Sequence, residues 1–290
     1  MYDPSATKEA VVREPSISRK PPIRIGAVSY LNARPLFFCL APMAPTAEIV
    51  VDVPSRLAEG LASGDLDVAL VSSIQHFRTP GSTIVSDACV ACRGPVRSLK
   101  LYGRVGPEEI RTLALDEGSR TSAALTRILL KERFGLEPQI ERLPIGASAD
   151  DTRADAVMLI GDRGMRPLEG RFAFVWDLGE EWVRWTGLPF VCAMWVARPR
   201  AELDGLDRVL ESARDEGQRR LEEIARRAAP EIGVSGQECL AYLRDDLVFR
   251  LGERERRGLL LFSQYAVRHG LASTGGRLVF YDPRDSEEGD

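Results

Sequence analysis

Residues 23–36 read IRIGAVSYLNARPL, and this stretch decides how the rest of the chain is interpreted. Its first half, residues 23–28, is a short β-favouring apolar run, which predicts a buried strand. Three polar side chains follow within four residues: Ser29, Tyr30 and Asn32. Open α/β sheets bind ligands at the carboxyl ends of their strands, so this turn predicts a ligand site. The alternative is an ordinary strand-to-helix loop with polar caps.

Two more predicted strands end in small polar residues. Residues 67–71 run into Ser72 and Ser73, and residues 112–116 (TLALD) lead to Ser119-Arg120-Thr121-Ser122 at the start of a predicted helix. Free N–H groups at a helix N-terminus favour an anion, and hydroxyls add further donors. Helix capping explains one hydroxyl but not three with an arginine. We therefore predict a carboxylate or phosphate site at residues 119–122.

Strands alternate with helices along most of the chain, which predicts an α/β fold with mainly parallel sheets flanked by helices. Residues 203–270 are expected to be nearly all helical. The composition does not change sharply anywhere, so two lobes joined by more than one crossing are expected. The predicted strands around 96–104 and 190–197 are the hinge candidates. The remaining predicted strands are 48–53, 83–91, 156–161, 172–178 and 278–281.

The composition excludes several classes of protein. The chain has 290 residues, of which 44% are hydrophobic, and a net charge of −4 from 39 basic and 43 acidic residues. This near-balanced charge does not indicate a basic surface for nucleic acid or a polybasic segment for a membrane surface. There is no run of about 18 apolar residues, so no membrane span is expected. The first 21 residues lack a signal-peptide pattern, which predicts a disordered leader and a cytoplasmic protein.

The cysteines and histidines predict neither a disulfide framework nor a metal site. Five scattered cysteines are an odd number, and the one C-x-x-C, Cys89 and Cys92, would need two more ligands to hold zinc. The chain has only two histidines, His76 and His269. Both cysteines are therefore interpreted as small apolar residues in or beside a strand.

Two single residues add to the predicted cleft. Ser98 follows a Gly94-Pro95 break and could face a cleft between lobes, and Asp162 follows a predicted strand and could accept a ligand hydroxyl or cap the next segment. The common catalytic motifs are missing, among them G-x-G-x-x-G, the P-loop, G-x-S-x-G and H-E-x-x-H. His76 lies close in sequence to Ser72 and Ser73, but no carboxylate is placed to support it. From the residues alone, the chain is a two-lobed α/β protein with a polar cleft for a small anion.

The ordered motifs resemble those of the chorismate dehydratases of the futalosine route to menaquinone, from about residue 23 to 281. One departure is Arg163-Gly164-Met165, where a small residue and an apolar pair are expected. The matching motifs are Val28-Ser29-Tyr30-Leu31-Asn32, Pro35-Leu36, Gly94-Pro95-Val96-Arg97-Ser98, Ser119-Arg120-Thr121-Ser122, Ile160-Gly161-Asp162, Asp177-Leu178-Gly179, Trp182, Thr186-Gly187-Leu188-Pro189-Phe190 and Trp195.

The resemblance implies the two-lobed fold of type II periplasmic binding proteins, with a ligand cleft between the lobes. It implies dehydration of chorismate to 3-[(1-carboxyvinyl)oxy]benzoate, with no metal or organic cofactor. The oligomeric state stays open between monomer and homodimer. The expected divisions are a leader at 1–21, a first lobe at 22–106 plus 198–283, a second lobe at 107–197 and a loose acidic tail at 284–290.

The resemblance also assigns roles to the candidate residues. Asn32 and Ser98 are expected to be catalytic and to orient the leaving hydroxyl or the enolpyruvyl group. The base is not evident among the side chains, and the enolpyruvyl carboxylate of the substrate is one candidate. The expected substrate-binding residues are Ser29, Tyr30, Ser72, Ser119, Arg120, Thr121, Ser122 and Asp162.

Three alternatives remain open at this point. One is a solute-binding protein of the same fold without chemistry, although no signal peptide is evident. A second is the sister enzyme that makes 1,4-dihydroxy-6-naphthoate, although its N-terminal pattern lacks Ser-Tyr-Leu-Asn. A third is the effector-binding domain of a transcription regulator, although no DNA-binding helix pair precedes Ile23.

Overall fold

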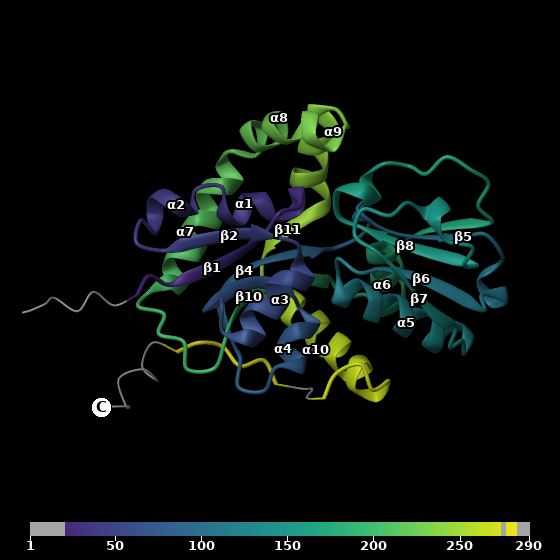
Figure 1. Cartoon of the computed structure of the whole chain (residues 1–290), viewed down its shortest axis with the longest axis horizontal. Coiled ribbons are helices and arrows are strands. Elements are labelled where there is room, and N and C mark those ends of the chain that lie inside the picture. Colours follow the sequence, from purple (N-terminus) through teal and green to yellow (C-terminus); the bar gives the residue numbers. More distant parts are fainter. Residues whose placement is uncertain (1–20, 274–276, 283–290) are drawn as a thin grey trace, which may run out of the picture.

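The computed structural model describes residues 21–273 and 277–282, which form two lobes, each built on its own sheet (Figure 1). The predicted leader, up to residue 20, and the predicted acidic tail, 284–290, lie outside the described residues. No helix in the described ranges is long and apolar enough to cross a bilayer.

The first lobe contains a six-stranded sheet in the order β11-β4-β10-β3-β1-β2. Helices α1, α2 and α7 cover one face of this sheet, and α3, α4 and α10 cover the other (Figure 1). Its strands are β1 (Arg24–Val28), β2 (Glu48–Asp52), β3 (Val68–Ser72), β4 (Thr83–Cys92), β10 (Phe190–Ala197) and β11 (Leu247–Arg250). Its helices and helical turns are η1 (Leu31–Ala33), α1 (Arg34–Phe37), α2 (Leu40–Met43), α3 (Pro54–Ser63), α4 (Ile74–Arg78), α7 (Leu206–Arg219), α8 (Leu221–Ile232), α9 (Gly236–Ala241), the π-helical turn η5 (Tyr242–Asp246) and α10 (Glu253–Arg268).

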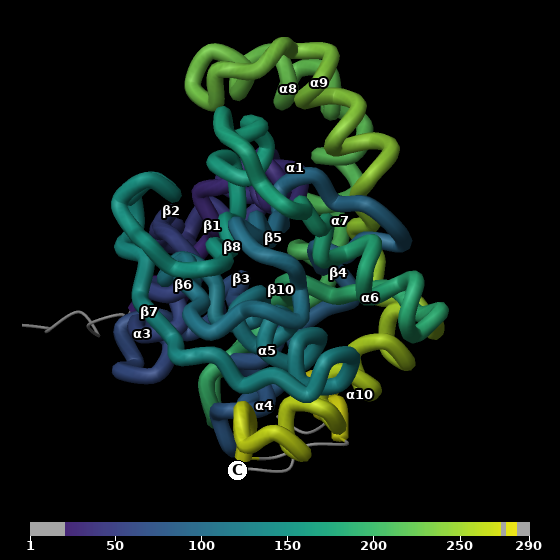
Figure 2. The backbone as a smooth tube through the Cα atoms, turned by 90° about the vertical axis from the view of Figure 1, so that its right-hand side faces the viewer, coloured from purple at the N-terminus to yellow at the C-terminus, as the bar shows by residue number. Residues whose placement is uncertain are grey.

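The second lobe contains a five-stranded sheet in the order β7-β6-β8-β5-β9. It faces the viewer in Figure 2, where α8 and α9 of the first lobe project above it. Its strands are β5 (Leu99–Gly103), β6 (Thr112–Asp116), β7 (Gln139–Leu143), β8 (Ala156–Ile160) and β9 (Phe174–Asp177). Its helices and turns are η2 (Pro107–Glu109), α5 (Arg120–Phe134), η3 (Ala149–Asp151), η4 (Gly161–Met165) and α6 (Leu178–Thr186).

The sheets are mixed, so the prediction of mainly parallel sheets is wrong in this detail. Among the described strands, four neighbouring pairs are parallel and five are antiparallel. Parallel neighbours need a crossover such as a helix between them, and the βα alternation of the sequence indicated these. However, β5 and β10 each begin just after the chain has crossed between lobes, and each runs antiparallel to both of its neighbours.

The same two strands correct the predicted lobe boundaries. The sequence placed β5 in the first lobe and β10 in the second, but β5 pairs with β8 and β9, and β10 pairs with β3 and β4. The chain therefore crosses between the sheets at residues 93–98 and again at 187–189. Each hinge candidate is a strand that follows a crossing.

Three smaller predictions also change. Strand β11 interrupts the region expected to be nearly all helical. Edge strand β7 was not predicted, because two of its five residues (QIERL) are charged. Of the predicted strand at 278–281, a single bridge between Ile84 and Phe280 is present.

The apolar strands that the sequence indicated form the centre of each lobe. All five residues of β3 and all five of β8 are buried, as expected for strands covered on both faces. Trp182 and Trp195 are fully buried, and Trp185 packs against Tyr265 with 4.8 Å between ring centroids. These tryptophans therefore belong to the core.

Candidate functional site

A cavity with about 490 Å³ of empty space, part of it open to solvent, lies between the two lobes. It is formed where the ends of β1, β3 and β8, the first crossing, the start of α5 and the middle of β10 meet. Its lining residues are Val28, Tyr30, Asn32, Ala33, Pro54, Ser72, Val90, Val96, Ser98, Leu99, Ser119, Ser122, Ile160, Gly161, Cys192 and Ala193.

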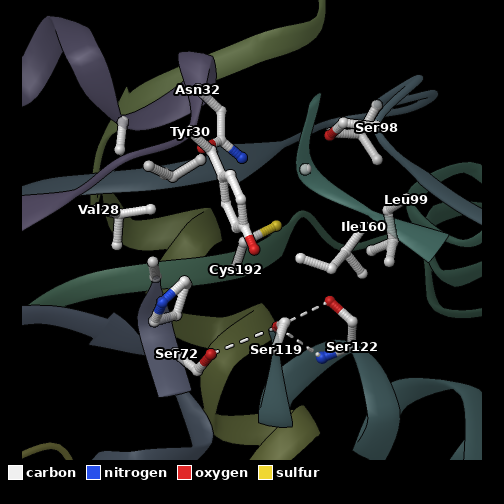
Figure 3. A pocket seen from close by; sticks show the side chains of 16 residues that line it. Val28, Tyr30, Asn32, Ser72, Ser98, Leu99, Ser119, Ser122, Ile160 and Cys192 are labelled. Atoms are coloured by element: carbon white, nitrogen blue, oxygen red, sulfur yellow. Dashed lines mark hydrogen bonds between the residues drawn. The ribbon is translucent and has the colours of Figure 1, made fainter. Parts of the chain in front are cut away.

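The polar side chains of this cavity gather at two ends, which we call poles (Figure 3). Asn32 and Ser98 form the amide pole, and Ser72, Ser119 and Ser122 form the serine pole on the opposite side. The ring of Tyr30 lies between them, with its hydroxyl directed toward the serine pole. Six of the ten predicted site residues thus line one cavity.

The serine pole is built on the N-terminus of α5. Ser119 caps this 15-residue helix, because its Oγ accepts the backbone N–H of Ser122 at 3.3 Å. The Ser119 hydroxyl also lies 3.0 Å from the Ser122 hydroxyl and 3.3 Å from that of Ser72 in the other lobe. Three hydroxyls and the positive end of a long helix are therefore directed into one corner, which suits a carboxylate.

Tyr30 reaches from the first lobe into the second. Its ring packs on Gly161, where a Cβ would lie 3.0 Å from the ring carbons and where the positive φ of 64° also favours glycine. Burial, together with the nearby carboxylate of Asp116, raises the pKa of the Tyr30 phenol far above its usual value. Tyr30 therefore enters the cavity as a neutral hydroxyl that can donate a hydrogen bond.

Ser98 follows a strained turn that several side chains hold in place. Arg97 has a φ of 54°, and the Ser98 N–H closes a tight turn onto the carbonyl of Val96 at 2.5 Å. The carboxylate of Asp177 accepts the backbone N–H groups of Val96 (3.0 Å) and Arg97 (2.8 Å). Such a turn persists only where its surroundings hold it, and here they aim Ser98 at the cavity.

The loop with Arg163-Gly164-Met165, where the sequence departs from the family pattern, supports the same turn. A Cβ on Gly164 would overlap the carbonyl of Ser98, so only glycine allows this approach. Arg163 pairs with Asp116, whose side chain is buried, and also donates to the carbonyl of Ala147 at 2.6 Å. Burial raises the pKa of Asp116, and Arg163 opposes that rise.

Four predicted binding residues lie outside the cavity lining. The side chains of three of them, Asp162, Thr121 and Arg120, form hydrogen bonds between the lobes. The Asp162 carboxylate accepts the N–H of Leu31 at 2.9 Å, and the hydroxyl of Thr121 accepts that of Ile74 at 3.0 Å.

The other two of these four residues are Arg120 and Ser29. Arg120 pairs with Glu59 and donates to Gln75, each at 3.1 Å across the lobe boundary. The Ser29 backbone N–H joins β1 to β2 through the carbonyl of Asp52 at 3.0 Å. Neither residue lines the cavity.

The sequence did not point to Cys192 or to the apolar wall of the cavity. Cys192 lines the cavity because β10 has a register shift between Val191 and Ala193, and a bulge of this kind has no sequence signature. Val28, Val90, Val96 and Ile160 were recognisable as strand or core residues, but not as ligand contacts.

The lining contains no carboxylate, imidazole, guanidinium or ammonium among the residues that the structure describes. His76 lies elsewhere, with its Nδ1 3.1 Å from the hydroxyl of Ser82. Within residues 21–273 and 277–282, no three His, Cys, Asp or Glu side chains converge as metal ligands, and Cys89 and Cys92 are fully buried on β4. The cavity therefore offers neutral hydrogen-bond donors and a helix N-terminus.

Comparison with known proteins agrees with this architecture. Residues 23–268 match the family model described as menaquinone biosynthesis. The chain is 32% identical over 265 residues to the chorismate dehydratase of Thermus thermophilus, an alignment covering 84% of this chain and 94% of that protein.

Two solved structures show the fold. A protein from Archaeoglobus fulgidus has a TM-score of 0.66 at 16% identity, with 87% of this chain and 99% of that chain covered. The alkanesulfonate-binding protein of Xanthomonas axonopodis pv. citri, bound to MOPS, has a TM-score of 0.60 at 14% identity, with 90% and 96% covered. The fold is thus the two-lobed one of the periplasmic binding proteins, and the chain belongs to the menaquinone biosynthesis family.

Proposed function

We propose that this protein dehydrates chorismate to 3-[(1-carboxyvinyl)oxy]benzoate, the first step of the futalosine route to menaquinone. The observation that carries the proposal is a cavity between the lobes with neutral donors at two poles, in a chain 32% identical to a chorismate dehydratase. Chorismate is a dianion with a carboxylate on its ring, a second on its enolpyruvyl group and a hydroxyl beside the ether. Its polar groups suit a site of this kind.

The reaction needs little acid–base equipment from the protein. A proton leaves the ring carbon that bears the enolpyruvyl ether, and the C–O bond to the neighbouring hydroxyl breaks. The electron pair forms the last double bond of an aromatic ring, and hydroxide and proton leave together as water. Aromatisation drives the step, so the enzyme has to orient a dianion and stabilise the departing hydroxide.

The two poles divide these tasks in our proposal. The serine pole and the N-terminus of α5 hold one carboxylate of the substrate. Asn32 and Ser98 orient the leaving hydroxyl or the enolpyruvyl group, and Tyr30 lines the space between. The described lining contains no carboxylate or imidazole, which supports the enolpyruvyl carboxylate of the substrate as the base.

The four residues outside the lining receive different roles. We propose that Asp162, Thr121 and Arg120 keep the lobes closed over the substrate rather than contact it. Their bonds to Leu31, Ile74, Glu59 and Gln75 all join one lobe to the other. Closure excludes water, which strengthens each donor that faces the substrate. Ser29 holds β1 against β2.

A direct assay tests the proposal. Purified protein is mixed with chorismate, and the enolpyruvyl benzoate is followed by chromatography. We expect stoichiometric conversion with repeated turnover. Tight binding without conversion would instead support the solute-binding alternative, which the shared fold keeps open.

The cytoplasmic location is part of the same proposal. It is supported by the biosynthetic family to which the chain belongs. Fractionation of the native cells, followed by immunoblotting, should find the protein with cytoplasmic enzymes. Recovery with periplasmic proteins would favour a solute-binding role.

A further inference from the structure

Tyr242 is a buried tyrosine outside the cavity lining, and it contacts the catalytic candidate Ser98 of the amide pole. Its side chain is 1% exposed, and its hydroxyl donates to Ser98 Oγ at 2.6 Å, although the two residues are 144 positions apart. Asn32, the other catalytic candidate, lies near enough to the Tyr242 phenol to lower its pKa slightly. The Tyr242 hydroxyl therefore contacts one residue of the amide pole, Ser98, directly.

The geometry gives the direction of this hydrogen bond, which runs from the Tyr242 hydroxyl to Ser98 Oγ. Burial raises the pKa of Tyr242 well above its usual value, and the hydrogen bond with Ser98 only partly opposes that rise. Tyr242 therefore stays protonated, and its O–H donates a hydrogen bond to Ser98 Oγ. A serine oxygen that accepts from one side has its own proton left to donate, and Ser98 lines the cavity.

The segment that carries Tyr242 also holds the backbone of Ser98. Tyr242 begins the π-helical turn η5, a rare geometry found often at functional sites. Asp246, at the end of the same turn, pairs with the guanidinium of Arg97, with 2.6 Å between Nε and Oδ2. One five-residue turn therefore fixes both the strained residue before Ser98 and the hydroxyl of Ser98 itself.

We infer that Tyr242 is a positioning residue, which makes Ser98 a hydrogen-bond donor toward the substrate hydroxyl that leaves. The inference rests on the proposed dehydration for the role of Ser98. Tyr242 acts through Ser98 and does not touch the substrate. Hydrogen bonds in such a chain polarise one another, so the donor strength of Ser98 depends on Tyr242.

A double-mutant cycle tests the inference. Tyr242→Phe removes only the hydroxyl, and we expect kcat for chorismate to fall about tenfold to a hundredfold with KM within about threefold. In a Ser98→Ala background the same change should cost nothing further, because the partner is gone. Unchanged kcat in the single variant, or an additive loss in the double variant, would overturn the inference.

Tyr102→Phe is the matched control. Tyr102 is equally buried, at 3% exposed, but lies on β5 outside the cavity lining. We expect its kcat to stay within twofold of wild type. An equal loss in both variants would show that removing any buried phenol disturbs the fold, and would also overturn the assignment.

Wild type, the two single variants Tyr242→Phe and Ser98→Ala, and the double variant also separate this inference from the proposed function. If the wild type fails to convert chorismate, the proposed function is wrong. The double-mutant cycle can still be measured on the thermal midpoints of unfolding, which need no ligand. The Tyr242→Phe and Ser98→Ala shifts should be less than additive, because both remove one shared hydrogen bond. Additive shifts would overturn the inference whatever the substrate is.

Discussion

The serine pole and the amide pole of the cavity are built in different ways. Ser119 and Ser122 lie three residues apart at one helix N-terminus, and only Ser72 comes from elsewhere. The amide pole combines Asn32 after β1 and Ser98 on the crossing, backed by Gly164 and η5. The serine pole is mostly a local helix N-terminus whose capping hydroxyls also face the cavity, whereas the amide pole forms only when distant segments pack together. Changes at the serine pole should therefore weaken binding, and changes at the amide pole should slow the reaction.

The largest expected effect is at the amide pole itself. Asn32→Ala and Ser98→Ala should each lower kcat about 10²- to 10³-fold, the usual loss of one donor to developing charge, with KM changed little. Steady-state kinetics with chorismate measure both constants. Equal changes in kcat and in binding would contradict the division between the poles.

Ser86→Ala is the control for Ser98→Ala. Ser86 is 4% exposed on β4, and its Oγ accepts the N–H of Ala88 at 3.2 Å outside the cavity. We expect its kcat to remain within about twofold of wild type, since surroundings rather than burial alone decide the effect.

Next in size is a change behind the amide pole. Gly164→Ala should push the Ser98 carbonyl and lower kcat about tenfold or more, because small misplacements of a catalytic group are costly. Gly94→Ala, on the first crossing, is the control, since a Cβ there has nothing within 4 Å. Kinetics and thermal unfolding of both variants provide the comparison. A wild-type kcat in Gly164→Ala would show that this loop does not position Ser98.

At the serine pole the expected change is in KM. Ser119→Ala should raise KM for chorismate about tenfold, the loss of one hydrogen bond to a charged group, with a smaller effect on kcat. It should also lower the free energy of unfolding by about 1 kcal/mol through loss of the α5 cap. Ser235→Ala removes the cap of α9 and should show the stability loss alone. The same KM change in both variants would contradict carboxylate binding by Ser119.

The ionisation of two buried tyrosines should change the free energy of unfolding only at high pH, which makes it the smallest effect on stability at neutral pH. Tyr30 and Tyr242 keep their protons in the fold to a pH above the usual tyrosine pKa of about 10, because burial raises their pKa. Above about pH 10 the unfolded chain loses protons that the fold retains, so stability falls as pH rises, by up to about 1.4 kcal/mol per pH unit for each group. Denaturant unfolding from pH 8 to 11 should show a shallower slope for Tyr242→Phe, and no change below pH 9. An identical slope would show that Tyr242 ionises as freely in the fold as in the unfolded chain.

The contrast between the poles also explains what the sequence could predict. Serines and a threonine at a helix start have a local physical meaning, so residues 119–122 were recognisable as a helix N-terminus, and their role as an anion site stays a prediction. Asn32 and Ser98 were found at a strand end and after a Gly-Pro break, with their roles coming from the family pattern. Tyr242 and Asp246 carried no signal, because nothing local marks a tyrosine 144 residues away as a partner of Ser98.

The fold shows the same limit. Buried strands such as β3 and β8 were predicted because continuous apolar runs are a local property. The sheet to which β5 and β10 belong was predicted wrongly, since a strand's partner is set by the path of the chain after each crossing. Thr121 and Asp162 were similarly placed at the ligand, whereas their polar atoms bind backbone N–H groups of the other lobe.

Single-turnover kinetics test the division of labour between the poles most directly. With enzyme in excess over chorismate and above its dissociation constant, the rate of product formation reports the chemical step alone. We expect Ser98→Ala to slow this step about 10²- to 10³-fold, and Ser119→Ala to leave it within about threefold of wild type once the sites are filled. Equal slowing in the two variants, or a normal rate in Ser98→Ala, would contradict the account.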